Sequence, residues 1–167
     1  LVADEDIAEL RELVEKHQPR FVAVGNGSTS RETEKALRAI LNKLGEGKPD
    51  LVMINEAGVS VFATSDEAKE ELPNHDVATR AAISMGRRIQ DPLAELVKID
   101  PRSIGVGQYQ HDVNQKLLRQ QLADTIHACV NMVGVNVNTA SPQLLSFVSG
   151  FNSALGKSVV EHRKQNG

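Results

Sequence analysis

The sequence predicts an α/β half with a parallel sheet, followed by an all-helical half. Two short apolar runs, Phe21–Val24 and Leu51–Ile54, are bounded by turn residues, as buried strands are. Helical patterns precede the first run and separate it from the second. The order helix, strand, helix, strand indicates parallel strands joined by helical crossovers. From about residue 112 onward every periodic segment has helical spacing, so we expect the architecture to change there.

The first helix is predicted over 4–17, because apolar residues recur there at helical spacing: Ile7, Leu10, Leu13 and Val14. The first strand ends in the turn Gly25-Asn26-Gly27. Thr29 with Glu32 three residues later has the spacing of a capping box. It would open a helix whose apolar face comprises Ala36, Leu37, Ile40, Leu41 and Leu44.

Three further helix starts follow the second strand. Thr64 and Glu67 form another capping box, which would open a short helix ending before Pro73. Residues 76–90 are predicted to be helical. Asp91-Pro92 places a capping residue before proline, so a helix restarts there. The predicted packing positions of the 76–90 helix are Val77, Ala81, Ile83 or Ala82, Met85 and Ile89.

The segment 104–112 is predicted to be a joint between the two halves. Asp112 with Gln115 suggests a capping box for a long helix, and Cys129 on that helix is expected to be a small core residue. Ser141-Pro142 begins a helix through Val148. The last helix follows a turn at 149–152 and runs through 163. The predicted core face of the long helix comprises Val113, Leu117, Leu118, Leu122, Ile126, Val130 and Val133.

Composition excludes several classes of protein. Residues 1–76 hold 16 acidic and 9 basic residues, which argues against a broad nucleic-acid surface there, whereas residues 77–167 carry a small positive excess. The single cysteine cannot form an internal disulfide, and no apolar run reaches the roughly 20 residues that span a membrane. We therefore expect a cytoplasmic location, no membrane partner, no cofactor and no metal. The chain lacks an initial Met, and we expect it to be part of a longer protein.

The segment "LLSFVSGFNSALGKSVVEHRKQNG" resembles the helix-hairpin-helix element of DNA repair and competence proteins. In that element, backbone N–H groups at the second helix's N-terminus approach a phosphate, aided by the helix dipole and a lysine. The predicted contacts are the backbone of Gly150, Phe151, Asn152, Ser153 and Ala154 with Lys157, and Arg163 and Lys164 as weaker electrostatic aids. Asn152 stands where the element has a second glycine. Asparagine tolerates a left-handed conformation better than other non-glycine residues, but its side chain could keep a phosphate away. A hairpin used only for packing is the alternative.

Catalytic motifs are sparse. Glu56 follows the second strand, where α/β sheets place functional groups, and Asp76 is the next acidic candidate. A two-metal nuclease needs several converging carboxylates, and no third acid is evident. The stretch "VGNGSTSRETE" lacks the lysine of a phosphate-binding loop, so a strand-to-helix turn is favoured. The pairs His75-Asp76 and His111-Asp112 are interpreted as capping or surface residues rather than metal ligands.

Several strings together resemble the bacterial Tex family of transcription accessory proteins from about Phe21 to Gly167. They are "VGNGSTSRETE", "NEAGVSVFATSDEAKEELPNHDVATRAAISMGRRIQDPLAELVKIDPRSIGVGQYQHDVNQ" and "CVNMVGVNVNTASPQLLSFVSG". The resemblance implies that 1–103 is the latter part of a YqgF-type, ribonuclease H-like domain, that 104–112 is the joint, and that 113–167 is the helix-hairpin-helix region. It places a helical region before this part of the protein and an OB-type RNA-binding domain after it.

The resemblance also bears on catalysis. It implies that the first catalytic acid of the ribonuclease H-like fold would lie upstream of Leu1, so Glu56 and Asp76 would be vestigial here. The expected function is therefore non-catalytic nucleic-acid binding and scaffolding in a transcription accessory factor, with RNA or DNA contacted through its phosphates. RNA polymerase or other transcription proteins would be further partners. The alternatives are a metal-dependent, resolvase-like nuclease and a hub that docks only proteins.

Overall fold

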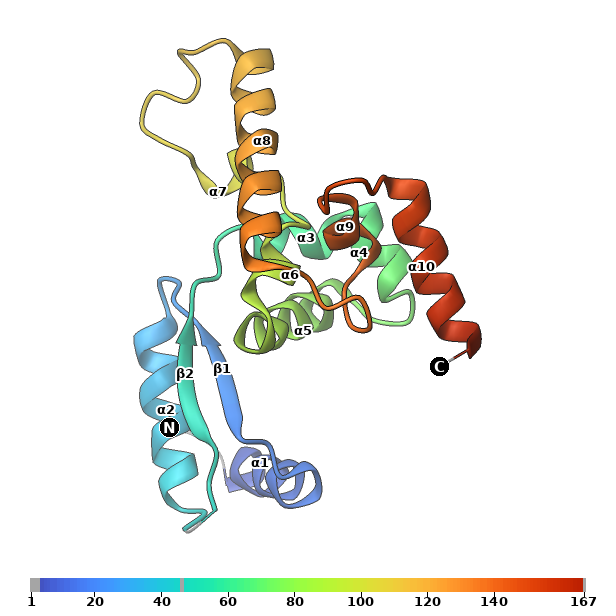
Figure 1. Cartoon of the computed structure of the whole chain (residues 1–167). Coiled ribbons are helices and arrows are strands. Elements are labelled where there is room, and N and C mark those ends of the chain that lie inside the picture. The colour runs from blue at the N-terminus through green and yellow to red at the C-terminus, as the bar shows by residue number, and fades with distance from the viewer. Residues whose placement is uncertain (1–3, 46, 167) are drawn as a thin grey trace.

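The computed structural model describes residues 4–45 and 47–166, with side chains from Ala8 onward, so the packing of Ile7 lies outside the described residues. The first part comprises α1 (Asp4–His17), β1 (Phe21–Gly25), α2 (Ser30–Asn42) and β2 (Asp50–Ile54). The two strands pair in parallel, with Phe21 opposite Asp50 and Gly25 opposite Ile54. Figure 1 shows α2 against this small sheet, with both carboxyl ends pointing toward the later helices. The predicted parallel α/β arrangement is confirmed.

The start of α2 differs from the predicted capping box. Thr29 precedes α2, but its side chain makes no capping hydrogen bond. Its backbone lies at φ −94° and ψ 1°, following a turn in which the Ser30 N–H donates to the Gly27 carbonyl at 3.1 Å. A capping residue normally has extended backbone, and Thr29 does not. The tight turn after β1 therefore replaces the side-chain cap.

Three helices follow the sheet: α3 (Val59–Thr64), α4 (Asp66–Glu71) and α5 (Val77–Gln90). The pattern did not predict α3, which begins after Gly58 in a left-handed conformation at φ 72°. The predicted Thr64 cap is wrong, because Thr64 is the last residue of α3 and donates to the Ser60 carbonyl at 3.0 Å. Ser65 instead caps α4 by accepting the Ala68 N–H at 3.1 Å. As predicted, α4 ends before Pro73.

Helix α5 spans the predicted residues but buries a different face. Val77 is 48% exposed, whereas Arg80, Ser84 and Arg88, spaced four residues apart, are buried. Arg80 Nε donates to the Leu72 carbonyl at 3.1 Å, and Arg88 donates to two carbonyls at the end of β2. The predicted positions Ala81, Ile83, Met85 and Ile89 are half-buried. The pattern missed the most buried positions of α5, because these bind carbonyl and carboxylate oxygens rather than apolar side chains.

The remaining helices are α6 (Pro92–Leu96), α7 (Pro101–Ile104), α8 (Gln115–Val133), α9 (Pro142–Ser146) and α10 (Ser153–Asn166). The predicted caps at Asp91 and Ser141 are confirmed, since each accepts the N–H three residues later. The Asp112 cap is wrong. Asn114 caps α8 by accepting the N–H groups of Lys116 and Leu117 at 3.0 and 3.1 Å.

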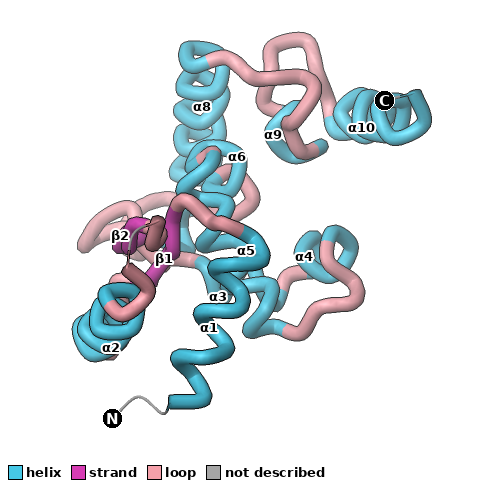
Figure 2. Tube along the Cα trace, turned by 90° about the horizontal axis from the view of Figure 1, so that it is seen from below, coloured by secondary structure: helices cyan, strands magenta, loops and turns pink. Residues whose placement is uncertain are grey.

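The second part of the molecule has a core of its own. Its buried centre comprises Val130, Ala140, Leu144 and Leu145, and three residues around α6 pack against it: Leu93, Ala94 and Val97. Figure 2 shows α6 between α8 and the sheet-proximal helices. Of the predicted core face of α8, Val130 is buried, Ile126 packs against the core, and Leu118 and Leu122 are half-buried. The ends of that face were predicted wrongly, because Val113, Leu117 and Val133 are exposed, and so is Cys129.

The described strands are β1 and β2 alone, and everything described after Ile54 is helix or loop. The predicted domain boundaries around the 104–112 joint stay a prediction. Among the described helices, none is both long and apolar enough to cross a membrane.

Candidate nucleic-acid interface

The hairpin between α9 and α10 is closed by a glycine and capped by an asparagine. Gly150 has φ 86°, a conformation that glycine adopts without strain, and the next N–H, of Phe151, donates to the Val148 carbonyl at 2.9 Å. Asn152 Oδ1 accepts the Leu155 N–H at 2.8 Å. The backbone of Asn152 is not left-handed, because Gln18 is the only non-glycine residue with positive φ among those described. Asparagine therefore serves here as the helix cap.

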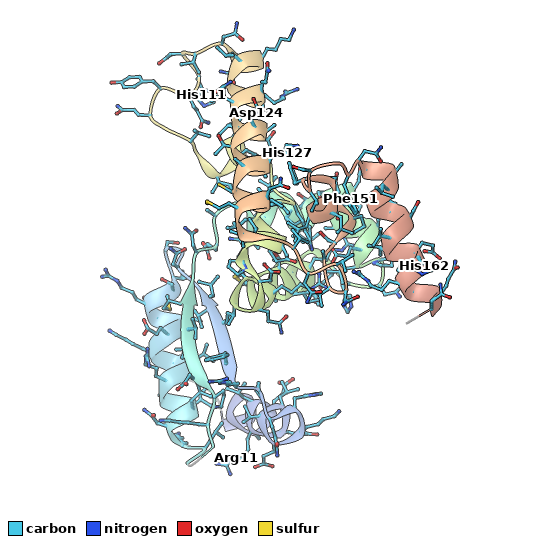
Figure 3. All side chains as sticks on the ribbon, viewed as in Figure 1. Arg11, His111, Asp124, His127, Phe151 and His162 are labelled. Atoms are coloured by element: carbon cyan, nitrogen blue, oxygen red, sulfur yellow. The ribbon has the colours of Figure 1, made fainter. Side chains whose placement is uncertain are left out.

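The C-terminal part of α8 holds this turn in place. Asn131 donates to the Phe147 carbonyl at 2.9 Å and accepts the Ser149 N–H at 2.8 Å. His127 Nδ1 lies 3.0 Å from the same Phe147 carbonyl oxygen, and the two rings meet edge to face at 5.0 Å. Figure 3 shows His127 on α8 beside the hairpin that carries Phe151. The turn is thus pre-positioned by side chains outside the hairpin.

A glycine that the sequence interpretation passed over sets the distance between the two hairpin helices. Gly156 is buried in α10, and a Cβ there would lie 2.8 Å from the Pro142 carbonyl oxygen and 3.4 Å from the Leu145 Cβ. The backbones of α9 and α10 therefore approach as closely as glycine permits. The available signal was an isolated glycine inside a helical pattern, where glycine is otherwise disfavoured.

The N-terminus of α10 presents unused hydrogen-bond donors. In the part of the chain that the structure describes, the N–H groups of Ser153 and Ala154 have no acceptor, and both residues are exposed. Lys157 is exposed one turn further along the helix. Free N–H groups and the positive end of a 14-residue helix favour an anion. These exposed N–H groups and Lys157 have the chemistry of an anion site, and phosphate binding there stays a prediction.

The two other predicted cations lie further along α10. Arg163 donates to the Val137 carbonyl at 2.8 Å and to the Ala140 carbonyl at 3.0 Å, so it ties α10 to the loop between α8 and α9. Lys164 is exposed, with its Nζ 4.0 Å from a Glu161 carboxylate oxygen. Their predicted part in nucleic-acid binding stays a prediction, and of the two only Lys164 has its charged group turned to solvent.

A cleft of about 1180 Å³ separates α10 from α4–α6. Lys157 and Lys164 line one wall, whereas Glu67 and Glu70 of α4 line the opposite wall. The acidic wall disfavours a phosphate deep in the cleft, because like charges repel. A phosphate is therefore best placed at the outer, turn-facing end of α10.

The carboxyl end of the sheet is organised differently. The Glu56 carboxylate lies over the loop after β1, where a Cβ at either Gly25 or Gly27 would meet it. Its backbone N–H donates to Asn26 Oδ1 at 3.1 Å. Arg88 donates to the carbonyls of Asn55 and Ala57 on either side. The backbone groups next to Glu56 are therefore hydrogen-bonded, whereas the residue itself is exposed.

Asp76 is not brought to Glu56. Asp76 caps α5, where Oδ1 accepts the Thr79 N–H at 2.7 Å, and its hydrogen bonds with Thr79 lower the pKa of the Asp76 carboxyl. Met85, nine residues after Asp76 on α5, lies at the end of β1, where a Cβ added at Gly25 would meet both its Sδ, at 3.4 Å, and the Glu56 carboxylate. At about 1.5 Å per residue, roughly 14 Å of helix separates Asp76 from Met85, and therefore from the position of Glu56. No cluster of three metal-ligating side chains occurs in the described region.

The family models divide the chain in the same order as the structure. A model described as "Tex protein YqgF-like domain" matches residues 2–90, and one described as "Helix-hairpin-helix motif" matches residues 130–167. The second match contains α9, α10 and the end of α8 that holds the turn.

The chain is also similar to much longer proteins. "Transcriptional accessory protein Tex" of Neisseria gonorrhoeae is 47% identical over 161 residues, which cover 96% of this chain and 21% of that protein. "Protein tex" of Bordetella pertussis is 49% identical, covering 96% of this chain and 20% of its own length. Human "S1 RNA-binding domain-containing protein 1" is 45% identical over 148 residues, covering 87% of this chain and 15% of its length. The chain thus spans about a fifth of the length of its bacterial relatives.

Proposed function

The chain belongs to the Tex family, as a fragment of a transcription accessory protein with a helix-hairpin-helix motif, and from that premise we propose that it binds nucleic acid without cutting it. The phosphate backbone of RNA or DNA contacts the N-terminus of α10. The sheet and helices before it act as a scaffold that positions the hairpin.

One observation carries this proposal. The N–H groups of Ser153 and Ala154 are exposed and have no acceptor among the described residues, while Lys157 stands one turn away. The turn itself is fixed by Asn152 and by the bonds from α8, so little order is lost on binding. A pre-positioned phosphate site binds without regard to base sequence, because phosphate contacts carry no sequence information directly.

Two features support a binding rather than a catalytic role. Asp76 caps the start of α5, whereas Glu56 lies after β2 at the level of Met85, and the backbone N–H of Glu56 bonds to Asn26. A metal-dependent phosphodiesterase needs carboxylates that converge on shared ions. The competing nuclease function would require acids from another part of the full-length protein to complete a site at Glu56.

The human relative is named for an RNA-binding domain, and this name favours RNA as one ligand of the full-length proteins. We propose RNA polymerase or other transcription proteins as further partners, since a bacterial relative is named for an accessory role in transcription. The cytoplasmic location stays a prediction.

The test compares charge reversals in the full-length protein. Lys157→Glu removes a cation beside the α10 N-terminus, so affinity for both single- and double-stranded substrates should fall about tenfold, and the salt slope should flatten by roughly one unit. Lys35→Glu, on an exposed position of α2, is the matched control and should leave both unchanged. Equal binding by the Lys157 variant and the wild type would overturn the phosphate site.

Cleavage is assayed in the same samples with Mg²⁺ or Mn²⁺ and branched substrates. We expect no cleavage by the wild type. Cleavage by the wild type that Glu56→Gln abolishes would establish the nuclease alternative instead.

A further inference from the structure

The cleft between α10 and helices α4–α6 has two walls of opposite charge. Lys157 and Lys164 line the α10 wall, whereas Glu67 and Glu70 line the α4 wall. Figure 2 shows α4 and α10 as separate helices on the same side of the molecule. The acidic wall therefore lies across the cleft from the helix that carries the proposed phosphate site.

The lysines and the carboxylates of the two walls are not joined to each other. Glu67 and Glu70 are exposed, and among the described residues neither forms an ion pair. Lys157 is also exposed and unpaired in that part of the chain, and the Lys164 Nζ lies 4.0 Å from a Glu161 carboxylate oxygen. An unpaired carboxylate attracts nearby cations and repels a phosphate. The acids of α4 thus act on the same lysines that a phosphate would use.

The α4 wall is held in place by a buried ion network. Lys98 Nζ lies 2.7 Å from a Glu95 carboxylate oxygen and 3.0 Å from a Glu71 carboxylate oxygen, and the side chains of Lys98 and Glu95 are each 3% exposed. Glu71, the last residue of α4, also pairs with Arg87. Ala68, between the two unpaired acids of α4, is buried. Because the charges of the network pair with one another, Glu67 and Glu70 are the unpaired charges that α4 presents to the cleft.

The α10 wall is held as well. Gly156 brings α10 against α9, and Arg163 binds two carbonyls of the loop between α8 and α9. With both walls held, the lysines and the carboxylates stay apart, so the attraction across the cleft is left unsatisfied. The low-dielectric walls of a cleft focus such a field.

We propose that Glu67 and Glu70 compete with nucleic acid for Lys157 and Lys164, and thereby confine the phosphate backbone to the turn-facing end of α10. The inference rests on the proposed phosphate site and adds a competitor within the same chain. Lys164 lies seven residues after Lys157, about 10 Å further along the helix. It becomes a contact for a further phosphate when the acids opposite are neutralised.

The simpler alternative is that Glu67 and Glu70 contribute only to the net charge of the protein. In that case any two exposed acids would have the same effect on nucleic-acid binding. Competition is local instead, because exposed charges more than about 10 Å apart are largely screened at roughly 0.1 M salt. The position of the acids relative to α10 therefore distinguishes the two explanations.

The test measures the nucleic-acid affinity of the full-length protein over a salt series, for the wild type and for Glu67→Gln/Glu70→Gln. We expect the salt slope to steepen by roughly one unit, because one more phosphate is contacted. The affinity gain should be about tenfold at about 50 mM salt and should vanish by roughly 0.5 M, since a slope steeper by one unit loses tenfold over that range. Glu12→Gln/Glu15→Gln is the matched control, because it removes two exposed carboxylates at the same spacing from α1, and it should change neither quantity.

A second substitution identifies the lysine that the acids occupy. Lys164→Gln alone should leave affinity close to that of the wild type, because the acids already keep phosphate away from Lys164. In the Glu67→Gln/Glu70→Gln background the same change should remove most of the gain, and such non-additivity is expected of groups that interact. All three residues are exposed, so each variant should keep wild-type stability, which thermal unfolding checks.

Three results would overturn the competition: no gain from the two glutamines, an equal gain from the α1 control, or a gain that Lys164→Gln leaves intact. The Lys157→Glu variant keeps these results separate from the phosphate site itself. If Lys157→Glu weakens binding and the two glutamines do not strengthen it, only the competition fails. If Lys157→Glu has no effect, the phosphate site fails, and the competition fails with it.

Discussion

The carboxyl end of the sheet and the N-terminus of α10 both gather polar groups at the end of an element, yet they use them in opposite ways. At the sheet, the Glu56 carboxylate rests over Gly25 and Gly27, and Arg88 binds the carbonyls on either side of Glu56. At α10, the N–H groups of Ser153 and Ala154 have no acceptor in the described structure. The backbone groups beside Glu56 are taken up by internal hydrogen bonds, whereas those at the start of α10 have no acceptor among the described residues.

The difference follows from what surrounds each end. Helix α5 crosses the sheet end and contributes a buried arginine that needs acceptors, so the local carbonyls bind it. The supporting bonds from His127 and Asn131 reach the turn at Phe147 and Ser149, and within the described part of the chain no hydrogen bond reaches the first N–H groups of α10. Arg88 thus links α5 to the carboxyl end of the sheet, while the first N–H groups of α10 have no acceptor in the described structure.

The largest effect is expected from adding one methyl group at the hairpin. Gly156→Ala places a Cβ 2.8 Å from the Pro142 carbonyl oxygen, so α9 and α10 must move apart. We expect the free energy of unfolding to fall by about 1–3 kcal/mol, and nucleic-acid affinity to fall with it. Chemical denaturation and a binding titration measure the two.

Gly86→Ala is the matched control, because it makes the same change inside α5 with nothing within 4 Å of the new Cβ. It should stabilise the protein by roughly 0.5–1 kcal/mol, since alanine favours a helix over glycine. If both variants shift stability in the same direction, the close approach at Gly156 does not determine the hairpin geometry.

A smaller effect on stability is expected from replacing Asp76. The direction in which this effect changes with pH distinguishes a helix cap from a catalytic acid. Hydrogen bonds with Thr79 hold the pKa of Asp76 below its ordinary value of 3.8. A lowered pKa in the folded state adds stability above the unfolded pKa, and this stability is lost as the pH falls through the folded pKa. A general acid would instead require a raised pKa.

The stability advantage of the wild type over Asp76→Asn should therefore shrink as the pH is lowered from about 6 to below 3.8. Thermal unfolding across this range measures it, with Asp124→Asn in the middle of α8 as the control. An advantage that grows on acidification would contradict the capping role.

Structural features that are set by an unambiguous local signal were predictable from the sequence. Both strands, their parallel order and the bounds of α5 follow from apolar runs and from turn residues. The caps at Asp91 and Ser141 were also predictable, because the proline that follows each one fixes the first helical position.

The other caps could not be predicted in this way, because two nearby residues can each serve as the N-cap of the same helix. Ser65 replaces Thr64, and Asn114 replaces Asp112, through the direction in which the preceding segment enters the helix. That direction is set by tertiary packing, which the spacing of two residues does not encode. The apolar pattern likewise missed the buried face of α5, because Arg80, Ser84 and Arg88 are polar.

The candidate site was predictable in its position but not in its details. The hairpin motif located the start of α10, yet the sequence alone did not indicate that Asn152 caps the helix rather than adopting a left-handed backbone. The sequence also gave no sign that Arg163 binds two carbonyls of the loop between α8 and α9. Both facts depend on contacts between segments that the motif does not contain.

The most direct test of the open α10 N-terminus is Asn152→Asp in the full-length protein, with stability and nucleic-acid affinity measured on the same preparation. Aspartate keeps the capping oxygen and adds a negative charge that the helix dipole favours. That same charge repels a phosphate at Ser153 and Ala154. We predict unchanged or higher stability together with weaker binding. Stability and affinity that both stay at wild-type values would contradict phosphate binding at this helix end.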